Sequence, residues 1–299
     1  MLIQDGREIL YTGKEFCSSP KMNFLILKSC HKFIPLYPFS MRFNLSLHTI
    51  SHPAILPVNY QYPLAAAIYK ILGRADPAYA TFLHEQGYHR LGSLKSFKLF
   101  TFSDLRTPFH IAGDRLHLKT NTASLTICFH LPKAAENFIK GLFIEQEIDI
   151  ADTKNKVTFC VQQVEAVAMP MEENGMVLQP FSPIVCGRKN DRGNYDFLAP
   201  GDPDFIPQLL YNWREKYGTL YNDSDLIFTD AGMEVRFYKN PPKSRLITIK
   251  ADTEEASQVR GFVNFQLKVC GRKEALELLL NSGAGVYNSM GMGCLGMAN

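Results

Sequence analysis

The sequence predicts an α+β protein built from two ferredoxin-like units in tandem, each with the element order βαββαβ. Three observations predict this class. The 299 residues exceed the usual size of one domain and allow two cores. Two successive stretches, 41–169 and 176–299, repeat the same order of strand and helix patterns. A turn-rich segment without periodicity, Met169–Gly175, separates them and marks the domain boundary.

The first unit begins with a strand at 42–50, where apolar and polar residues alternate. Two helices follow, at 63–72 and 77–86, and the second has start and stop signals at its ends. The other elements expected here are a strand at 97–102, a hairpin of 109–112 and 115–119 around Gly113-Asp114, a strand at 124–129, a helix from Pro132 to near Gly141, and a strand at 157–168.

The second unit follows the same order and ends in a glycine-rich loop. Its central feature is an amphipathic helix at 205–217, which contains the only tryptophan, Trp213. The remaining expected elements are strands at 176–185, 234–238, 246–250 and 261–269, a helix at 272–281, and the loop itself at 283–296. The same sandwich occurs in RNA-recognition motifs, so RNA is one partner to consider.

Residues 1–40 precede these patterns and form an N-terminal extension. We expect it to be poorly ordered or to precede the true start codon. The short apolar patch Phe24–Leu27 lacks the layout of a signal peptide, so a targeting segment is the weaker alternative.

Composition excludes several classes of protein. No apolar run reaches the roughly 18 residues that a membrane-spanning helix needs, so we expect no membrane association. The net charge of +3 permits a local basic groove on a surface that is otherwise balanced. The seven cysteines are dispersed without a CxxC pair, which indicates reduced thiols inside a cell. No histidine or cysteine cluster has metal-ligand spacing, so we expect neither a metal site nor a cofactor.

The glycine-rich loop is the most informative local feature. Glycine at this density leaves backbone N–H groups accessible, which suits contact with phosphates. A dinucleotide-binding turn requires a strand before the glycines and a helix after them, whereas here a helix comes first and the chain ends soon afterwards. A nucleotide cradle of that type is therefore disfavoured, which leaves a nucleic acid or no ligand as the alternatives for this loop.

The loop GAGVYNSMGMGCLG, from Gly283 to Gly296, resembles the C-terminal signature of the Cas6 family, the CRISPR-repeat RNA endoribonucleases. The resemblance spans about Met41 to the C-terminus. Four further patches resemble the family in the same order, namely Val58–Tyr62, Leu64–Tyr69, Tyr79–Glu85 and Lys98–Ser103.

The resemblance implies metal-independent cleavage of one phosphodiester bond in each CRISPR repeat. A ribose 2′-hydroxyl attacks the phosphate and leaves 2′,3′-cyclic phosphate and 5′-hydroxyl ends. The matching catalytic positions are Tyr69, His84 and Lys98. The implied partners are CRISPR repeat RNA and possible further CRISPR effector subunits, for a cytoplasmic monomer or homodimer. A protein that binds the repeat without cutting it is the alternative.

His84 has support that does not depend on the family. Asp76 suits the N-cap of its helix, Pro77 the first position and Gly87 the end. The histidine thus lies in the last turn, where the helix dipole favours the protonated imidazole that could donate to a leaving oxygen. It points about 140° away from Tyr79 on the apolar stripe, so burial in the core is disfavoured.

Tyr69 and Lys98 also leave the apolar faces of their elements. Tyr69 lies about 140° from Leu64 on its helix, and it could either position the 2′-hydroxyl or remove its proton. Lys98 is expected to alternate with Phe97 and Leu99 along a strand, so its ammonium could neutralise the pentacovalent phosphorane. Lys95 is the alternative cation.

Basic and glycine residues of the second unit are the candidate RNA contacts. Two prolines stiffen the loop that carries Lys239, Lys243 and Arg245, which would anchor phosphates without reading sequence. In the glycine-rich loop, the candidate contacts are Gly283, Gly285, Asn288, Ser289, Gly291 and Gly293, either touching RNA phosphates or supporting the site.

Overall fold

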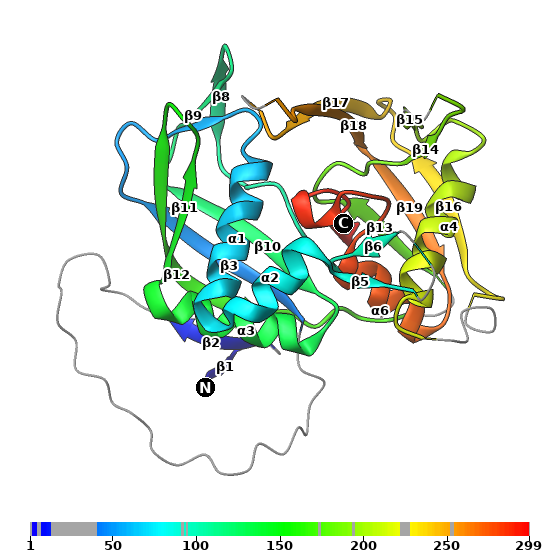
Figure 1. Ribbon diagram of the computed structural model, residues 1–299, viewed down its shortest axis with the longest axis horizontal. Helices are drawn as coiled ribbons and strands as arrows, with labels where there is room; N and C mark the ends of the chain where they lie inside the picture. Colours follow the sequence, from blue (N-terminus) through cyan, green and yellow to red (C-terminus); the bar gives the residue numbers. More distant parts are fainter. Residues whose placement is uncertain are drawn as a thin grey trace, which may run out of the picture.

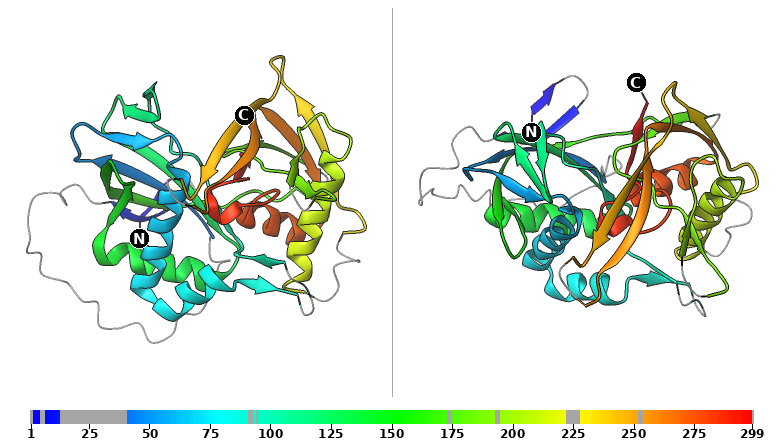
Figure 2. Two further views of the ribbon diagram at one scale, coloured as in Figure 1. Left: turned by 45° about the horizontal axis from the view of Figure 1, so that its top comes forward. Right: turned by 90° about the horizontal axis from the view of Figure 1, so that it is seen from above.

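The computed structural model describes residues 2–4, 7–12, 41–90, 93, 95–172, 175–192, 195–221, 228–251 and 254–298. It has two α/β halves, each with an antiparallel sheet and helices packed on it. The halves lie side by side with the C-terminal segment between them (Figure 1), and two further views show the same arrangement (Figure 2). The predicted mixture of α and β structure is confirmed.

The central sheet of the first half has the strand order β12-β3-β10-β7. β3 lies inside this sheet because its alternate residues are apolar on the covered face: Phe43, Leu45 and Leu47 are all buried. The antiparallel register places Leu45 beside Leu125 of β10 and Val164 of β12, so apolar side chains share one face. The bounds are Arg42–Thr49 for β3, Phe100–Phe102 for β7, Thr122–Phe129 for β10 and Lys156–Ala166 for β12.

Three helices pack on this half, in the regions where the sequence predicts helices. They are α1 (Gln61–Ala75), α2 (Pro77–Glu85) and α3 (Pro132–Glu145). α1 and α3 approach so closely that a Cβ at Gly141 would lie 1.8 Å from the Ile71 carbonyl oxygen. Glycine is therefore required at the crossing of the two helices.

The far side of β12 carries additional strands. β11 (Glu147–Ala151) pairs with the first part of β12, and β2 (Arg7–Thr12), which pairs with β1 (Leu2–Gln4), joins its last part. β2 thus continues the sheet along the part of this edge that β11 leaves open. That residues 1–40 are poorly ordered or precede the true start codon stays a prediction. Residues 13–40 lie outside the described part of the chain.

The single strand expected at 97–102 is wrong. Leu99 has a left-handed backbone with φ of 53°, which separates β6 (Ser96–Phe97) from β7. β6 pairs with β5 (Tyr88–His89), and both Phe97 and Leu99 pack into the core of the second half. The segment therefore crosses from one half to the other between Leu99 and Phe100, directly after Lys98.

A three-stranded sheet at one end of the first half contains the expected hairpin. β8 (Phe109–Ala112) and β9 (Arg115–Leu118) flank Gly113-Asp114, and β4 (Ile55–Pro57) pairs with β9. The hairpin predicted from Gly113-Asp114 is confirmed.

The sheet of the second half has the order β16-β19-β13-β20. The helices α4 (Phe205–Gly218) and α6 (Lys273–Ser282) belong to this half, and a short β14–β15 pair accompanies α4. The strand expected at 176–185 ends at Pro180, and the one expected at 261–269 is interrupted at Asn264, whose φ is 66°. The bounds are Met176–Pro180 for β13, Gly187–Lys189 for β14, Tyr195–Phe197 for β15, Gly232–Phe237 for β16, Lys243–Ile249 for β17, Ser257–Val263 for β18, Phe265–Cys270 for β19 and Leu295–Met297 for β20.

Hydrogen bonds fix the two halves against each other along the C-terminal segment. Arg42 of β3 donates to the Leu295 carbonyl at 2.8 Å, and Thr101 of β7 donates to the Met292 carbonyl at 2.9 Å. The short 3-10 helix η1 (Asn288–Met290) packs against β7 and α1. The glycine-rich loop is therefore held directly against the elements that carry Tyr69 and Lys98.

Candidate active site

The helix that carries His84 is defined by its own sequence. The Asp76 carboxylate accepts from the Tyr79 N–H at 3.0 Å, Pro77 occupies the first position, and Gly87 follows the end with φ of 68°. Leu83 is buried against the sheet while the next residue, His84, is exposed. The expected orientation of His84 is confirmed, and it leaves the imidazole free to meet a ligand.

Tyr69 and His84 come from neighbouring helices and meet edge to face. Their ring centroids are 5.0 Å apart with an interplanar angle of 88°, and Phe100 of β7 supports the other side of the tyrosine. Burial raises the pKa of Tyr69 to about 12, although a hydrogen bond from Ser289 opposes this rise. A tyrosine with a raised pKa is a weak base at neutral pH, which favours a positioning role.

Lys98 lies close to the end of the helix that carries His84. A Cβ at Gly87 would be 2.8 Å from Lys98 Cδ and 3.0 Å from its Nζ. The Lys98 side chain therefore packs directly against Gly87. Burial lowers the pKa of Lys98. Lys95 is directed elsewhere, because its Nζ donates to the Tyr211 hydroxyl at 2.5 Å and lies 3.4 Å from Glu215. The structure thus favours Lys98 over Lys95 as the cation of this site.

A pocket of about 220 Å³ joins Lys98 to the glycine-rich loop. Residues 96–100 of the first half line one side, and Lys216 with residues 285–290 of the second half line the other. Ser289 lines the pocket, and its helix η1 packs against α1, which carries Tyr69. The structure therefore brings Tyr69, His84, Lys98 and the loop together, although they lie far apart in sequence.

The glycines of the loop face protein. Gly283, Gly285, Gly291 and Gly293 are all buried, and a Cβ at Gly293 would lie 1.9 Å from the Ala284 carbonyl oxygen. The N–H groups of Gly283, Gly291 and Gly293 donate to carbonyls of Leu279, Asn288 and Pro183. A direct phosphate contact by these three amides is therefore wrong, because the protein already occupies them. The alternative, that these glycines support the site, fits their packing.

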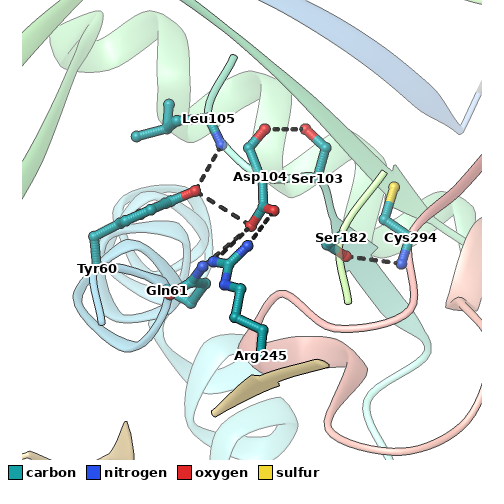
Figure 3. A network of polar contacts seen from close by, with 8 residues as sticks. All are labelled: Tyr60, Gln61, Ser103, Asp104, Leu105, Ser182, Arg245 and Cys294. Atoms are coloured by element: carbon teal, nitrogen blue, oxygen red, sulfur yellow. Dashed lines mark hydrogen bonds and ion pairs between the residues drawn. The ribbon is translucent and has the colours of Figure 1, made fainter. Parts of the chain in front are cut away.

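The basic loop of the second half is only partly available to a ligand. Lys239 and Lys243 are exposed, at the bend between β16 and β17. Arg245 instead forms a two-contact ion pair with Asp104 of the first half, at 2.5 and 3.2 Å, which Tyr60 and Gln61 also contact (Figure 3). The expectation that Arg245 anchors a phosphate is therefore wrong, since its guanidinium is already paired.

Lys216 was not expected at the site. It lies on α4 with only 2% of its surface exposed and lines the pocket beside Lys98. A signal for it is present in the sequence: Lys216 continues the apolar stripe of Leu209 and Trp213 at helical spacing. A lysine on the buried stripe of a helix needs a polar partner, and that requirement marks it for attention.

Among the residues that the structure describes, no three histidine, cysteine or acidic side chains gather closely enough to hold a metal ion. None of the helices in that part of the chain is both long and apolar enough to cross a bilayer.

Two family models together match most of the chain. The model for the N-terminal part of CRISPR-associated protein Cas6 matches residues 55–165, and the model for the Cas6 C-terminal part matches residues 165–297. The residues that line the pocket, 96–100, 216, 282 and 285–290, all lie within the matched residues.

Individual relatives agree with these models. The chain is 30% identical over 259 residues to CRISPR-associated endoribonuclease Cas6 1 of Methanocaldococcus jannaschii, covering 85% of this chain and 91% of the relative. It is 25% identical to CRISPR-associated endoribonuclease Cas6 of Pyrococcus furiosus, covering 80% and 82%. A solved structure of a CRISPR associated protein Cas6 superposes with a TM-score of 0.64 at 26% identity, covering 87% of this chain and 99% of that one. The chain therefore belongs to the Cas6 family.

Proposed function

We propose that this protein is an endoribonuclease that cuts CRISPR precursor RNA once within each repeat and so releases guide RNAs. Membership of the Cas6 family supports the substrate, and the relative from M. jannaschii carries the name of an endoribonuclease. The observation that carries the proposal is the convergence of Tyr69, His84 and Lys98 beside one pocket.

The reaction is an internal transfer at phosphorus. The ribose 2′-oxygen upstream of the cut attacks the phosphorus, the bond to the 5′-oxygen breaks, and a 2′,3′-cyclic phosphate and a 5′-hydroxyl result. The 2′-hydroxyl loses one proton and the leaving oxygen gains one, so the step consumes no water. It also needs no metal ion, because side chains supply both the charge and the proton.

Each side chain has a role that fits its place. His84, exposed in the last turn of α2, donates the proton to the leaving 5′-oxygen. The Lys98 ammonium stabilises the negative charge that develops on the phosphorane oxygens. Tyr69, whose pKa burial raises to about 12, orients the 2′-hydroxyl, and the proton of that hydroxyl passes to solvent.

The topology suits a substrate lying along both halves. In each half, the first, second, third and fourth main strands stand in the order 4-1-3-2, namely β12-β3-β10-β7 and β20-β13-β19-β16. We infer that both halves, 41–169 and 176–299, are ferredoxin-like domains. The extension 1–40 lies outside them. We further propose a cytoplasmic monomer or homodimer that acts with other CRISPR effector subunits.

The deciding experiment is cleavage of the repeat RNA from the organism's own CRISPR array, with EDTA present and the product ends analysed. We expect cleavage to persist and to leave cyclic phosphate ends. His84→Ala should slow cleavage by about 10²- to 10⁴-fold. The control His110→Ala, at an exposed histidine on the β8–β9 hairpin, should leave the rate unchanged. RNA that binds but stays intact would support the non-cleaving alternative.

A further inference from the structure

Lys216 is buried, and among the residues that the structure describes its Nζ hydrogen-bonds only to the glycine-rich loop. Its Nζ donates to the Gly283 carbonyl and to Asn288 Oδ1, each at 2.6 Å. No carboxylate of the described residues pairs with it, and burial lowers its pKa to about 7. Placing an ammonium group here is costly, and an apolar side chain of similar length would avoid that cost. Stability alone therefore does not explain a lysine at this position.

The two hydrogen bonds fix the conformation of the loop. With Asn288 Oδ1 turned toward Lys216, the Asn288 amide nitrogen donates to the carbonyls of Ala284 at 2.9 Å and Met292 at 3.0 Å. Asn288 thereby ties together the two ends of the loop, and Lys216 sets which way its amide faces. A substitution at Lys216 would therefore alter the hydrogen bonds of Asn288 to both Ala284 and Met292.

The loop then reaches the tyrosine of the site. Ser289 follows Asn288 directly in η1, and η1 packs against α1, which carries Tyr69 beside His84. Ser289 is near enough to the Tyr69 hydroxyl to oppose the rise in the pKa of Tyr69. Lys216 and Ser289 line the same pocket as Lys98. A continuous series of contacts thus runs from α4 of the second half to the candidate catalytic residues on α1 and α2 of the first.

We infer that Lys216 is a positioning residue for RNA cleavage: it fixes Asn288 and the loop so that Ser289 holds Tyr69 in place beside the pocket. The inference rests on the proposed function, because it names how the second half acts on that site. Lys216 itself is almost fully buried and is not expected to touch the scissile phosphate.

The test compares Lys216→Met and Lys216→Gln with the wild type in single-turnover cleavage, RNA binding and hydrogen exchange. We expect Lys216→Met to lower the cleavage rate constant about 10- to 100-fold at saturating enzyme, with RNA Kd unchanged. Lys216→Gln keeps a hydrogen-bond donor at this position, so its cleavage rate constant should fall less than that of Lys216→Met. Amides of residues 283–293 should exchange faster in Lys216→Met.

A control variant and a double-mutant cycle distinguish a positioning role of Lys216 from a general loss of structure. Leu209→Ala, at a buried position on the same helix, should lower the melting temperature without changing the rate constant. Asn288→Ala should reproduce the effect of Lys216→Met, and the double variant should be no slower than either single variant. Additive losses, or an unchanged rate constant in Lys216→Met, would overturn the inference.

The two proposals fail in different ways. If the wild type binds repeat RNA but does not cut it, the proposed function is wrong, and hydrogen exchange still tests the link from Lys216 to the loop. If the wild type cuts and the exchange of residues 283–293 is the same in Lys216→Met, the positioning role alone is wrong.

Discussion

Asp104 and Arg245 lie 141 positions apart in the chain and form an ion pair that joins the two halves of the molecule. Asp104 follows β7 of the first half, and Arg245 lies on β17, which pairs with β18 in the second half. Tyr60 and Gln61, at the start of α1, donate to the same carboxylate at 3.2 and 3.1 Å. This contact acts together with the hydrogen bonds of the C-terminal segment to place the halves relative to each other.

The first prediction concerns that ion pair. Asp104→Ala should lower the free energy of unfolding by about 1–3 kcal/mol, because it leaves a half-buried guanidinium without its acceptor. Arg245→Met should lower the free energy of unfolding by less than Asp104→Ala does, since Asp104 keeps Tyr60 and Gln61 as donors. Urea denaturation of both single variants and the double variant gives the coupling energy. A coupling energy of zero would contradict the role assigned to the pair.

The second prediction concerns the exposed lysines. The double variant Lys239→Met/Lys243→Met should bind RNA more weakly. The plot of log association constant against log salt concentration should also become less steep, by about 1 to 1.5 in the magnitude of its slope. The loss should be similar for all RNA sequences, because phosphate contacts carry no sequence information. Lys140→Met, at an exposed position on α3, is the control. A slope that stays at the wild-type value would remove both lysines from the RNA path.

The third prediction separates the roles of Tyr69 and His84. His84→Ala should reduce the single-turnover rate constant by about 10²- to 10⁴-fold, as expected for loss of a general acid. Tyr69→Phe should reduce it much less, because the phenyl ring keeps its contacts with His84 and Phe100 and only the hydroxyl is lost. RNA Kd should change little in either variant. If the rate constants of His84→Ala and Tyr69→Phe fall equally, the result would instead identify Tyr69 as the base that takes the 2′-proton.

The fourth prediction is a dependence of stability on pH at His130. This histidine lies after β10 and is 7% exposed, and burial lowers its pKa to about 4. Its folded pKa is below the unfolded value of about 6.5, so the unfolded chain binds the proton more readily. The stabilisation is complete above pH 6.5 and is lost as pH falls toward 4.

His130→Leu removes this proton linkage, and other titrating groups are common to both proteins. The free energy of unfolding of the wild type should therefore fall by about 1–3 kcal/mol more than that of the variant between pH 7 and 4.5. Parallel curves of unfolding free energy against pH for the two proteins would show that His130 is protonated equally in both states.

Local sequence patterns were sufficient to predict many of the helices and strands. The helix at 77–85 follows from Asp76, Pro77 and Gly87, because caps act over a single turn and need no tertiary partner. The exposed direction of His84 follows from helical geometry once its neighbours are apolar. The order of strands and helices, and the hairpin at Gly113-Asp114, follow in the same way.

Tertiary structure decided what each polar group contacts. Arg245 looks like an exposed cation in sequence and is paired because Asp104, from the other half, lies beside it. The glycines of the C-terminal loop look accessible, yet three of their amides are taken by the protein. Leu99 adopts a left-handed backbone because it and its neighbours pack into two different cores.

By itself, the sequence determined the helices, the order of the main elements and the exposed direction of His84, since these depend on contacts within a few residues. Only the tertiary structure decided that Lys98 shares a pocket with Ser289 and the buried Lys216, and that Tyr69 meets His84 nearby. Such contacts join residues from separate elements, and no periodicity or cap in either segment encodes its distant partner. The physical reason is that burial and pairing are set by the packing of the two halves.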